Sequence, residues 1–94
     1  MTYYTCRRAM LPTVEAALAA DGYRLELPLT KARNGDRITI MTRGAAIVLL
    51  AECAQSDLAA VEVLGNSPDA AITLLDELPA GLVRRAKRHE LVYQ

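Results

Sequence analysis

The chain has 94 residues, of which 52% are hydrophobic and 23% are charged, and its formal net charge at pH 7 is zero. This length and composition fit one globular domain spanning residues 1–94, and they argue against disorder and against a second domain. No apolar run approaches the ~20 residues that a membrane-spanning helix needs, and the first residues lack the apolar segment of a signal peptide. We therefore expect a cytoplasmic protein.

Two elements are expected before residue 23. The tyrosines and threonines of Thr2–Arg8 favour an extended segment that could lie at a sheet edge. From Leu11 to Leu18 the apolar residues follow helical spacing, with Pro12 in the first turn and Gly22 just beyond the end. This pattern predicts an N-terminal helix.

A β-hairpin is expected next. Leucines alternate with polar residues from Tyr23 to Leu29, and the alternation resumes around Ile38 and Ile40. Between these two segments lies a basic loop that includes Lys31 and Arg33, and Pro28 favours an edge position for the first strand.

The most apolar part of the chain runs from Gly44 to Gly65. Projected at helical spacing, its apolar residues cover nearly the whole circumference, which is typical of a buried helix. Ser56 and Asp57 favour a break into two helices, because both residue types cap helices well. A competing interpretation makes Ala60–Leu64 a short strand.

Two more helices are expected, at Pro68–Leu78 and Ala80–Glu90, joined at Pro79. Together these patterns predict an α+β domain with an N-terminal helix, a β-hairpin, and a mostly helical second half around a buried central helix. A third strand could come from either end of the chain.

The sequence contains no arrangement of residues that is typical of catalysis or cofactor binding. His89 is the only histidine, and no Cys, Asp or Glu cluster surrounds it at metal-ligand spacing. The adjacent Asp76 and Glu77 would point in different directions on a helix, so they cannot act as an acid and base pair. Cys6 and Cys53 match no metal or redox motif and are interpreted as small buried residues, with one disulfide as the alternative. We expect no enzyme, cofactor or metal site.

The charges are divided into three blocks that cancel. Residues 1–43 carry seven basic and four acidic side chains, a net charge of +3, and residues 84–94 carry four basic side chains and one acidic, again +3. Residues 44–83 contain no Lys or Arg and six carboxylates, a net charge of −6. Separate patches of opposite sign would steer association with charged partners. The carboxylates could equally pair with arginines of the same molecule.

In size, ordinary composition and lack of motifs, the chain resembles small phage-encoded inhibitors of bacterial defence, including anti-CRISPR proteins. The resemblance covers general build and no residue pattern. It implies a non-enzymatic protein-binding module whose acidic helical surface meets a basic site on a protein partner. The residues predicted to contact that partner are the six carboxylates of the acidic block: Glu52, Asp57, Glu62, Asp69, Asp76 and Glu77.

Two other functions fit the sequence. The first is nucleic-acid binding, in which the last two expected helices resemble a helix-turn-helix pair and Lys31, Arg33 and Arg37 assist a cluster formed by Arg84, Arg85, Lys87 and Arg88. The second is a homo-oligomeric structural or adaptor subunit, in which acidic and basic patches pair between copies.

Overall fold

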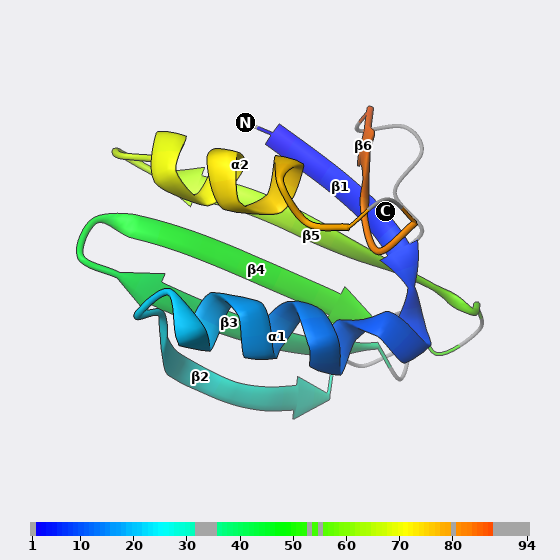
Figure 1. Cartoon of the computed structure of the whole chain (residues 1–94). Coiled ribbons are helices and arrows are strands. Elements are labelled where there is room, and N and C mark those ends of the chain that lie inside the picture. The colour runs from blue at the N-terminus through cyan, green and yellow to red at the C-terminus, as the bar shows by residue number, and fades with distance from the viewer. Residues whose placement is uncertain (1, 32–35, 53, 55, 80, 88–94) are drawn as a thin grey trace.

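The computed structural model describes residues 2–31, 36–52, 54, 56–79 and 81–87, with the backbone alone for residues 27–31. Within these residues the chain forms a six-stranded antiparallel sheet and two short α-helices, both of which lie on the same face of the sheet (Figure 1). The strand order is β2-β3-β4-β5-β1-β6. The expected α+β domain with a mostly helical second half is therefore wrong, because the second half is mainly strand.

The first half of the chain forms the expected local elements. Strand β1 (Thr2–Arg7) leads through a short 3₁₀ turn, Arg8–Met10, into helix α1 (Leu11–Ala20), which begins with a proline in its first turn. Strands β2 (Arg24–Lys31) and β3 (Arg37–Arg43) form the predicted antiparallel hairpin, and β2 is an edge strand of the sheet. Residues 32–35, including Arg33, lie outside the described residues.

The stretch that was expected to form a buried helix instead forms two central strands. These are β4 (Ala46–Glu52) and β5 (Leu58–Gly65), which pair antiparallel to each other. The break expected near Ser56 and Asp57 lies in the connection between them, and the competing prediction of a strand at Ala60–Leu64 is confirmed. Strand β1 pairs with β5, so it joins the sheet on the far side from the hairpin.

The end of the chain contains one of the two helices expected there. Helix α2 spans Asp69–Asp76, but the second predicted helix, Ala80–Glu90, is wrong: strand β6 (Arg84–Ala86) pairs with β1 at the sheet edge. Residues 88–94 lie outside the described residues, as does Cys53.

The hydrophobic core lies between the two helices and one face of the sheet. Val14 and Leu18 of α1 and Leu75 of α2 pack on the strand side chains that point toward them, and all three are essentially inaccessible to solvent. The strand residues of this core are Tyr4, Cys6, Met41, Ala46, Val48, Leu50, Ala59, Val61 and Val63. Cys6 is a free, buried cysteine, as the sequence suggested. No helix among the described residues is long and apolar enough to cross a membrane.

Candidate functional site

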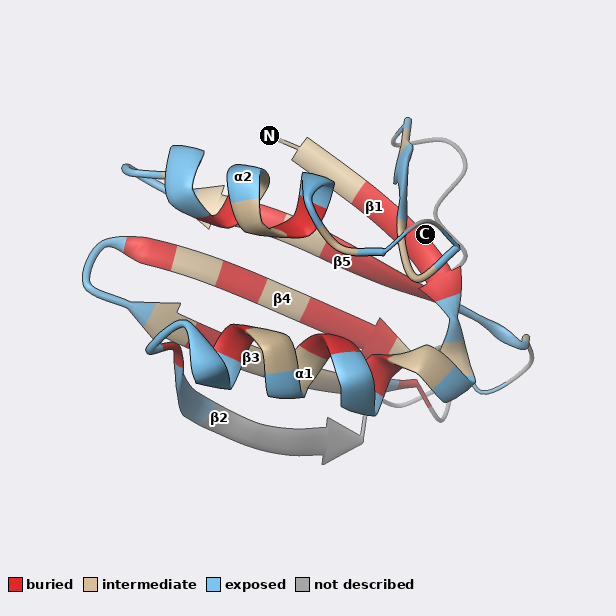
Figure 2. Ribbon diagram, in the orientation of Figure 1, coloured by how far each residue is buried: buried red, intermediate tan, exposed pale blue. Residues whose placement is uncertain are grey.

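The opposite face of the sheet is the most unusual surface of the molecule. Successive side chains of a strand point to opposite faces, so each residue that packs under a helix is followed by one that points away from both helices. Figure 2 shows this alternation along β4 as buried and partly exposed bands. The side that neither α1 nor α2 covers, which we call the open face, carries the partly exposed residues Tyr3, Ile38, Ile40, Ile47, Leu49 and Leu64.

These side chains are neighbours across the strands. Ile40 pairs with Leu49 in the β3–β4 register, and Ile47 pairs with Leu64 in the β4–β5 register. Ala51 and Ala60 form a second cluster and are fully buried, and partly buried residues that include Leu49 and Ile38 pack against them. An antiparallel sheet with one solvated face normally places polar residues on that face. Here aliphatic residues form most of the open face on β3 and β4, and Thr42 and Glu62 are polar residues on the same face.

The six carboxylates predicted to contact a partner do not share one surface. Glu52 ends β4 on the helix side, Asp57 lies before β5, and Glu62 is in the middle of β5 on the open face. Only the remaining three, Asp69, Asp76 and Glu77, belong to α2 or its end. An acidic surface built from all six on helices is therefore ruled out by the geometry.

Asp69 and Glu77 do lie together, along one groove. The groove has a volume of about 470 Å³ and runs between α2 and the end of α1, where Asp21 and Arg43 complete it. Arg43 donates a hydrogen bond to the Asp21 carboxylate at 2.7 Å, and its guanidinium lies 5.6 Å from the centre of the Tyr23 ring. The groove thus contains the carboxylates of Asp21, Asp69 and Glu77, and Arg43 neutralises that of Asp21.

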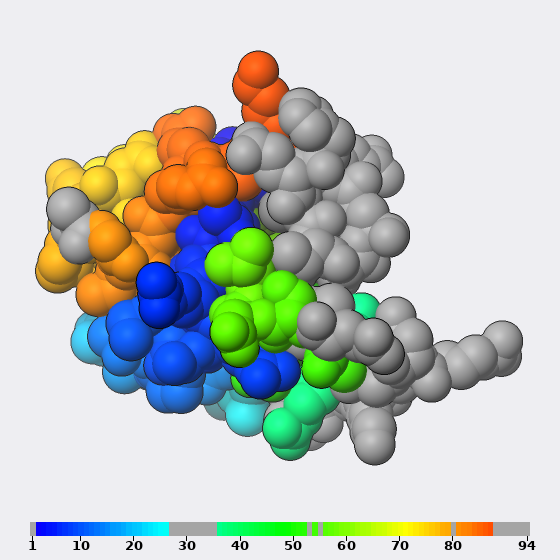
Figure 3. Space-filling model, turned by 90° about the vertical axis from the view of Figure 1, so that its right-hand side faces the viewer, coloured from blue at the N-terminus to red at the C-terminus, as the bar shows by residue number. Residues whose placement is uncertain are grey.

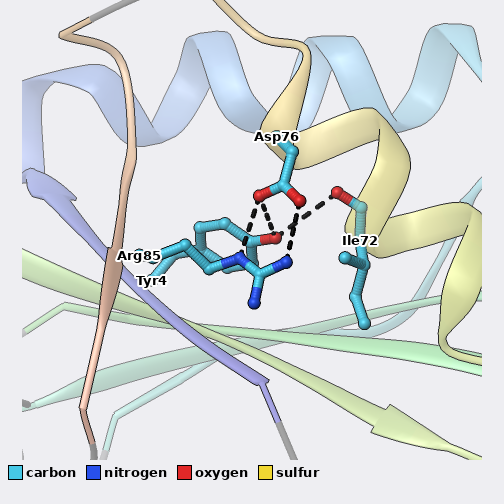
Figure 4. A network of polar contacts seen from close by, with 4 residues as sticks. All are labelled: Tyr4, Ile72, Asp76 and Arg85. Atoms are coloured by element: carbon cyan, nitrogen blue, oxygen red, sulfur yellow. Dashed lines mark hydrogen bonds and ion pairs between the residues drawn. The ribbon is translucent and has the colours of Figure 1, made fainter.

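Asp76 is held in a network that joins three elements (Figure 4). The Tyr4 hydroxyl of β1 donates to Asp76 at 2.7 Å, with the Ile72 carbonyl oxygen 3.3 Å away. Arg85 of β6 binds the same carboxylate through two hydrogen bonds, of 3.0 and 2.8 Å, and its guanidinium lies 5.5 Å from the centre of the Tyr4 ring. The network ties the edge strand β6 to the end of α2.

The network also shifts the acidity of its members. Hydrogen bonds from Arg85 and then from Tyr4 lower the pKa of Asp76 from 3.8 to about 2. Burial, followed by the hydrogen bond to Asp76, raises the pKa of Tyr4 to about 12, and the hydrogen bond to Asp76 raises the pKa of Arg85 further. These shifts stabilise the charged pair and leave no group poised for proton transfer near neutral pH.

This network predicts a specific loss of stability in acid. Because the folded-state pKa of Asp76 lies below its ordinary value, its contribution is present above about pH 4 and is lost as the pH falls toward about 2. We expect Asp76→Asn to lower stability at pH 7 and to flatten the pH dependence between pH 4 and 2, as measured by urea unfolding. Glu77→Gln, at the neighbouring exposed position, is the control. An unchanged acid profile in Asp76→Asn would contradict the assignment.

The basic residues predicted to bind nucleic acid are divided between the two sides of the sheet. Arg84 and Arg85 are consecutive in β6, so their side chains point to opposite faces, and Arg85 is engaged by Asp76. Lys87 follows the strand, and Arg88 lies outside the described residues. Arg37 is 4.0 Å from Glu52. The predicted helical cluster of basic residues is therefore not formed.

Three comparisons bear on the identity of the chain. No protein-family model, curated protein or solved structure matches it. In the described part of the chain, no group of three or more His, Cys, Asp or Glu residues is placed to hold a metal ion.

The open face was missed in the sequence because Ile47 and Leu49 were assigned to a helix together with Val48 and Leu50. Because residues 45–51 are all apolar, the period of the pattern could not separate the two sets. The signal in favour of a strand was the pair of β-branched residues Ile47 and Val48, which follow Gly44 closely.

Proposed function

We propose that this chain is a non-enzymatic protein-binding module, and that a protein partner covers its open face. The observation that carries the proposal is β4, which is apolar on both sides, whereas the described helices cover only one. Strands with this composition are typical of sheets buried on both faces. Contiguous apolar surface on a small protein marks interaction sites.

Other parts of the molecule support a binding role over a catalytic one. The pKa shifts at Asp76 and Arg85 strengthen an ion pair between structural elements, and burial raises the pKa of the Cys6 thiol to about 11, which suppresses its nucleophilic form. A cytoplasmic location and a partner in bacterial defence belong to the same proposal, and they rest on composition and general build.

The test is a pair of matched variants in a quantitative pull-down from nuclease-treated bacterial lysate. Ile47→Thr combined with Leu49→Thr makes the open face polar while keeping residues that favour strands. Asp69→Lys combined with Glu77→Lys reverses the acidic groove on the helix side. We expect the open-face variant to lose at least nine-tenths of a stoichiometric partner that the wild type and the groove variant retain.

Each outcome has a distinct meaning. Loss in the groove variant alone would place binding on the acidic side and overturn the open-face proposal. If the wild type captures no partner, its mass in solution decides: a dimer that the open-face variant converts to a monomer makes a second copy the partner. A monomer without any partner contradicts the proposal. Both variants must first show the wild-type circular dichroism spectrum.

A further inference from the structure

Two adjoining cavities lie at the corner of the sheet where β1 ends and β5 begins. The larger, of about 660 Å³, is lined by Arg7, Arg8, Ala9, Glu52, Asp57 and Leu58. The smaller, of about 170 Å³, is lined by residues 5–7, Leu58 and residues 81–84. Figure 3 shows these segments, far apart in the sequence, meeting on one side of the molecule. We call the region around Arg7, Arg8, Asp57, Leu58, Leu82 and Arg84 the Arg7 cleft.

Arg7 and Leu58 line both cavities. Arg7 carries the charge at this boundary. Its side chain is exposed, and none of the hydrogen bonds or ion pairs in the described part of the chain involves it. The two carboxylates of the larger cavity each lie near a different arginine: Asp57 is 4.0 Å from Arg8, and Glu52 is 4.0 Å from Arg37. The cleft therefore presents an uncompensated guanidinium to solvent.

Apolar surface adjoins this charge. Leu58 is 40% exposed, although it lies in a strand, and Leu82 and Val83 are among the residues that line the smaller cavity. A guanidinium beside exposed aliphatic groups suits a ligand that combines a carboxylate with an apolar group, since arginine binds carboxylates through two parallel hydrogen bonds.

The backbone at the cleft also favours an extended ligand. Strand β6 pairs with residues 3–5 of β1 only, whereas β5 pairs with the whole of β1. Residues 6 and 7 of β1 therefore have no partner in β6, and the smaller cavity is lined by these residues together with residues 81–84. A peptide in extended conformation can add to a strand at such an edge, with alternate side chains entering pockets.

We propose that the Arg7 cleft binds an acidic peptide segment in extended conformation. One carboxylate binds Arg7, and an adjacent apolar side chain packs on Leu58 at the entrance of the smaller cavity. The choice of a peptide as the occupant rests on the proposed function, because Arg7 and Leu58 point to the side of the sheet on which the open face lies. A partner would then place acidic residues at this corner and apolar residues on the open face.

The test uses the full chain and the capped peptide Asp-Leu-Glu-Val-Glu, with Lys-Leu-Lys-Val-Lys as the charge-reversed probe and glutarate as a free dicarboxylate. Binding is followed by amide chemical shifts in two-dimensional NMR. The acidic peptide should change the amide chemical shifts of residues 5–8, 57, 58 and 81–84. Its affinity should fall as the salt concentration is raised. Arg7→Gln and Leu58→Thr should each weaken it at least tenfold. Arg24→Gln, at the opposite edge of the sheet, should leave it unchanged.

Three results would overturn the inference: no shifts at the cleft with millimolar acidic peptide, equal binding of the lysine peptide, or equal weakening by Arg24→Gln. Binding of glutarate as tight as that of the acidic peptide would also overturn it, because the site would then recognise a small acid. The two proposals fail separately. If the open-face variant loses the lysate partner but the acidic peptide does not bind, only the cleft proposal is contradicted. If the peptide binds the cleft but the open-face variant keeps the partner, only the open-face proposal is contradicted.

Discussion

Replacing Leu50 with alanine is expected to lower the free energy of unfolding by about 3 kcal/mol, within the 2–5 kcal/mol typical of buried leucines. Leu50 is 1% exposed and lies in the middle of β4, facing the helices. Truncation of this side chain to alanine leaves a cavity, because the surrounding sheet and helices relax only in part. In a domain of this size the midpoint of thermal unfolding should fall by roughly 15 °C.

The neighbouring residue provides the matched comparison. Leu49 lies on the open face and is partly exposed, so Leu49→Ala should cost less than half as much in the isolated protein. Leu25→Ala should lower the free energy of unfolding by less than about 0.5 kcal/mol, because the Leu25 side chain is 57% exposed. Equal losses at positions 49 and 50 would mean that both faces of β4 are equally covered, and the basis of the proposed function would be removed.

The sequence was sufficient to predict those elements whose pattern is local. Helix α1 and the β2–β3 hairpin have a single apolar periodicity and clear boundary residues, and the structure contains both. Strand β4 was misassigned because a strand that is apolar on both sides gives no alternation, and a short apolar run of this kind cannot be distinguished from a buried helix by period alone.

Strand β6 was missed for a different reason. Arg84–Ala86 continue a helix-compatible pattern, but they pair with β1, which is about 80 residues away in the chain. Such pairing depends on the tertiary fold and overrides local preference. The same contact brings Arg85 to Asp76 and Tyr4, so the charge distribution along the sequence could suggest pairing within the molecule but could not specify which residues pair.

The strand topology determines where the charged residues of the three blocks lie in the structure. The acidic block was expected to form one helical surface, but half of its carboxylates lie on or beside the central strands, on different sides of the sheet. Basic residues from both ends of the chain pair with several of them, as Arg8 does with Asp57 and Arg85 with Asp76. Neutralisation within the molecule leaves apolar surface, more than charge, as the main feature available to a partner.

The second large effect is expected at Gly65, the last residue of β5. Its φ is +90°, and a Cβ at this position would overlap the carbonyl oxygen of Ala45 in the turn before β4. Gly81 has the same φ, but apart from its chain neighbours no atom of the described residues lies within 4 Å of the position that its Cβ would occupy. The two glycines therefore separate the cost of an unfavourable backbone conformation from the cost of a steric overlap.

Gly81→Ala should lower the free energy of unfolding by about 1 kcal/mol, because alanine rarely adopts positive φ. Gly65→Ala has the same unfavourable backbone conformation and should also displace the backbone of the turn. It should therefore lower the free energy of unfolding by about 3 kcal/mol or more. Guanidinium unfolding of both variants measures the difference directly. Because Gly65 pairs with Ala46 at the start of β4, the displacement should spread into the central strand pair, with loss of amide protection at positions 46–48. Equal losses in the two variants would show that the turn before β4 yields to the added methyl group, so that the contact between Gly65 and Ala45 adds nothing to the cost of the backbone conformation.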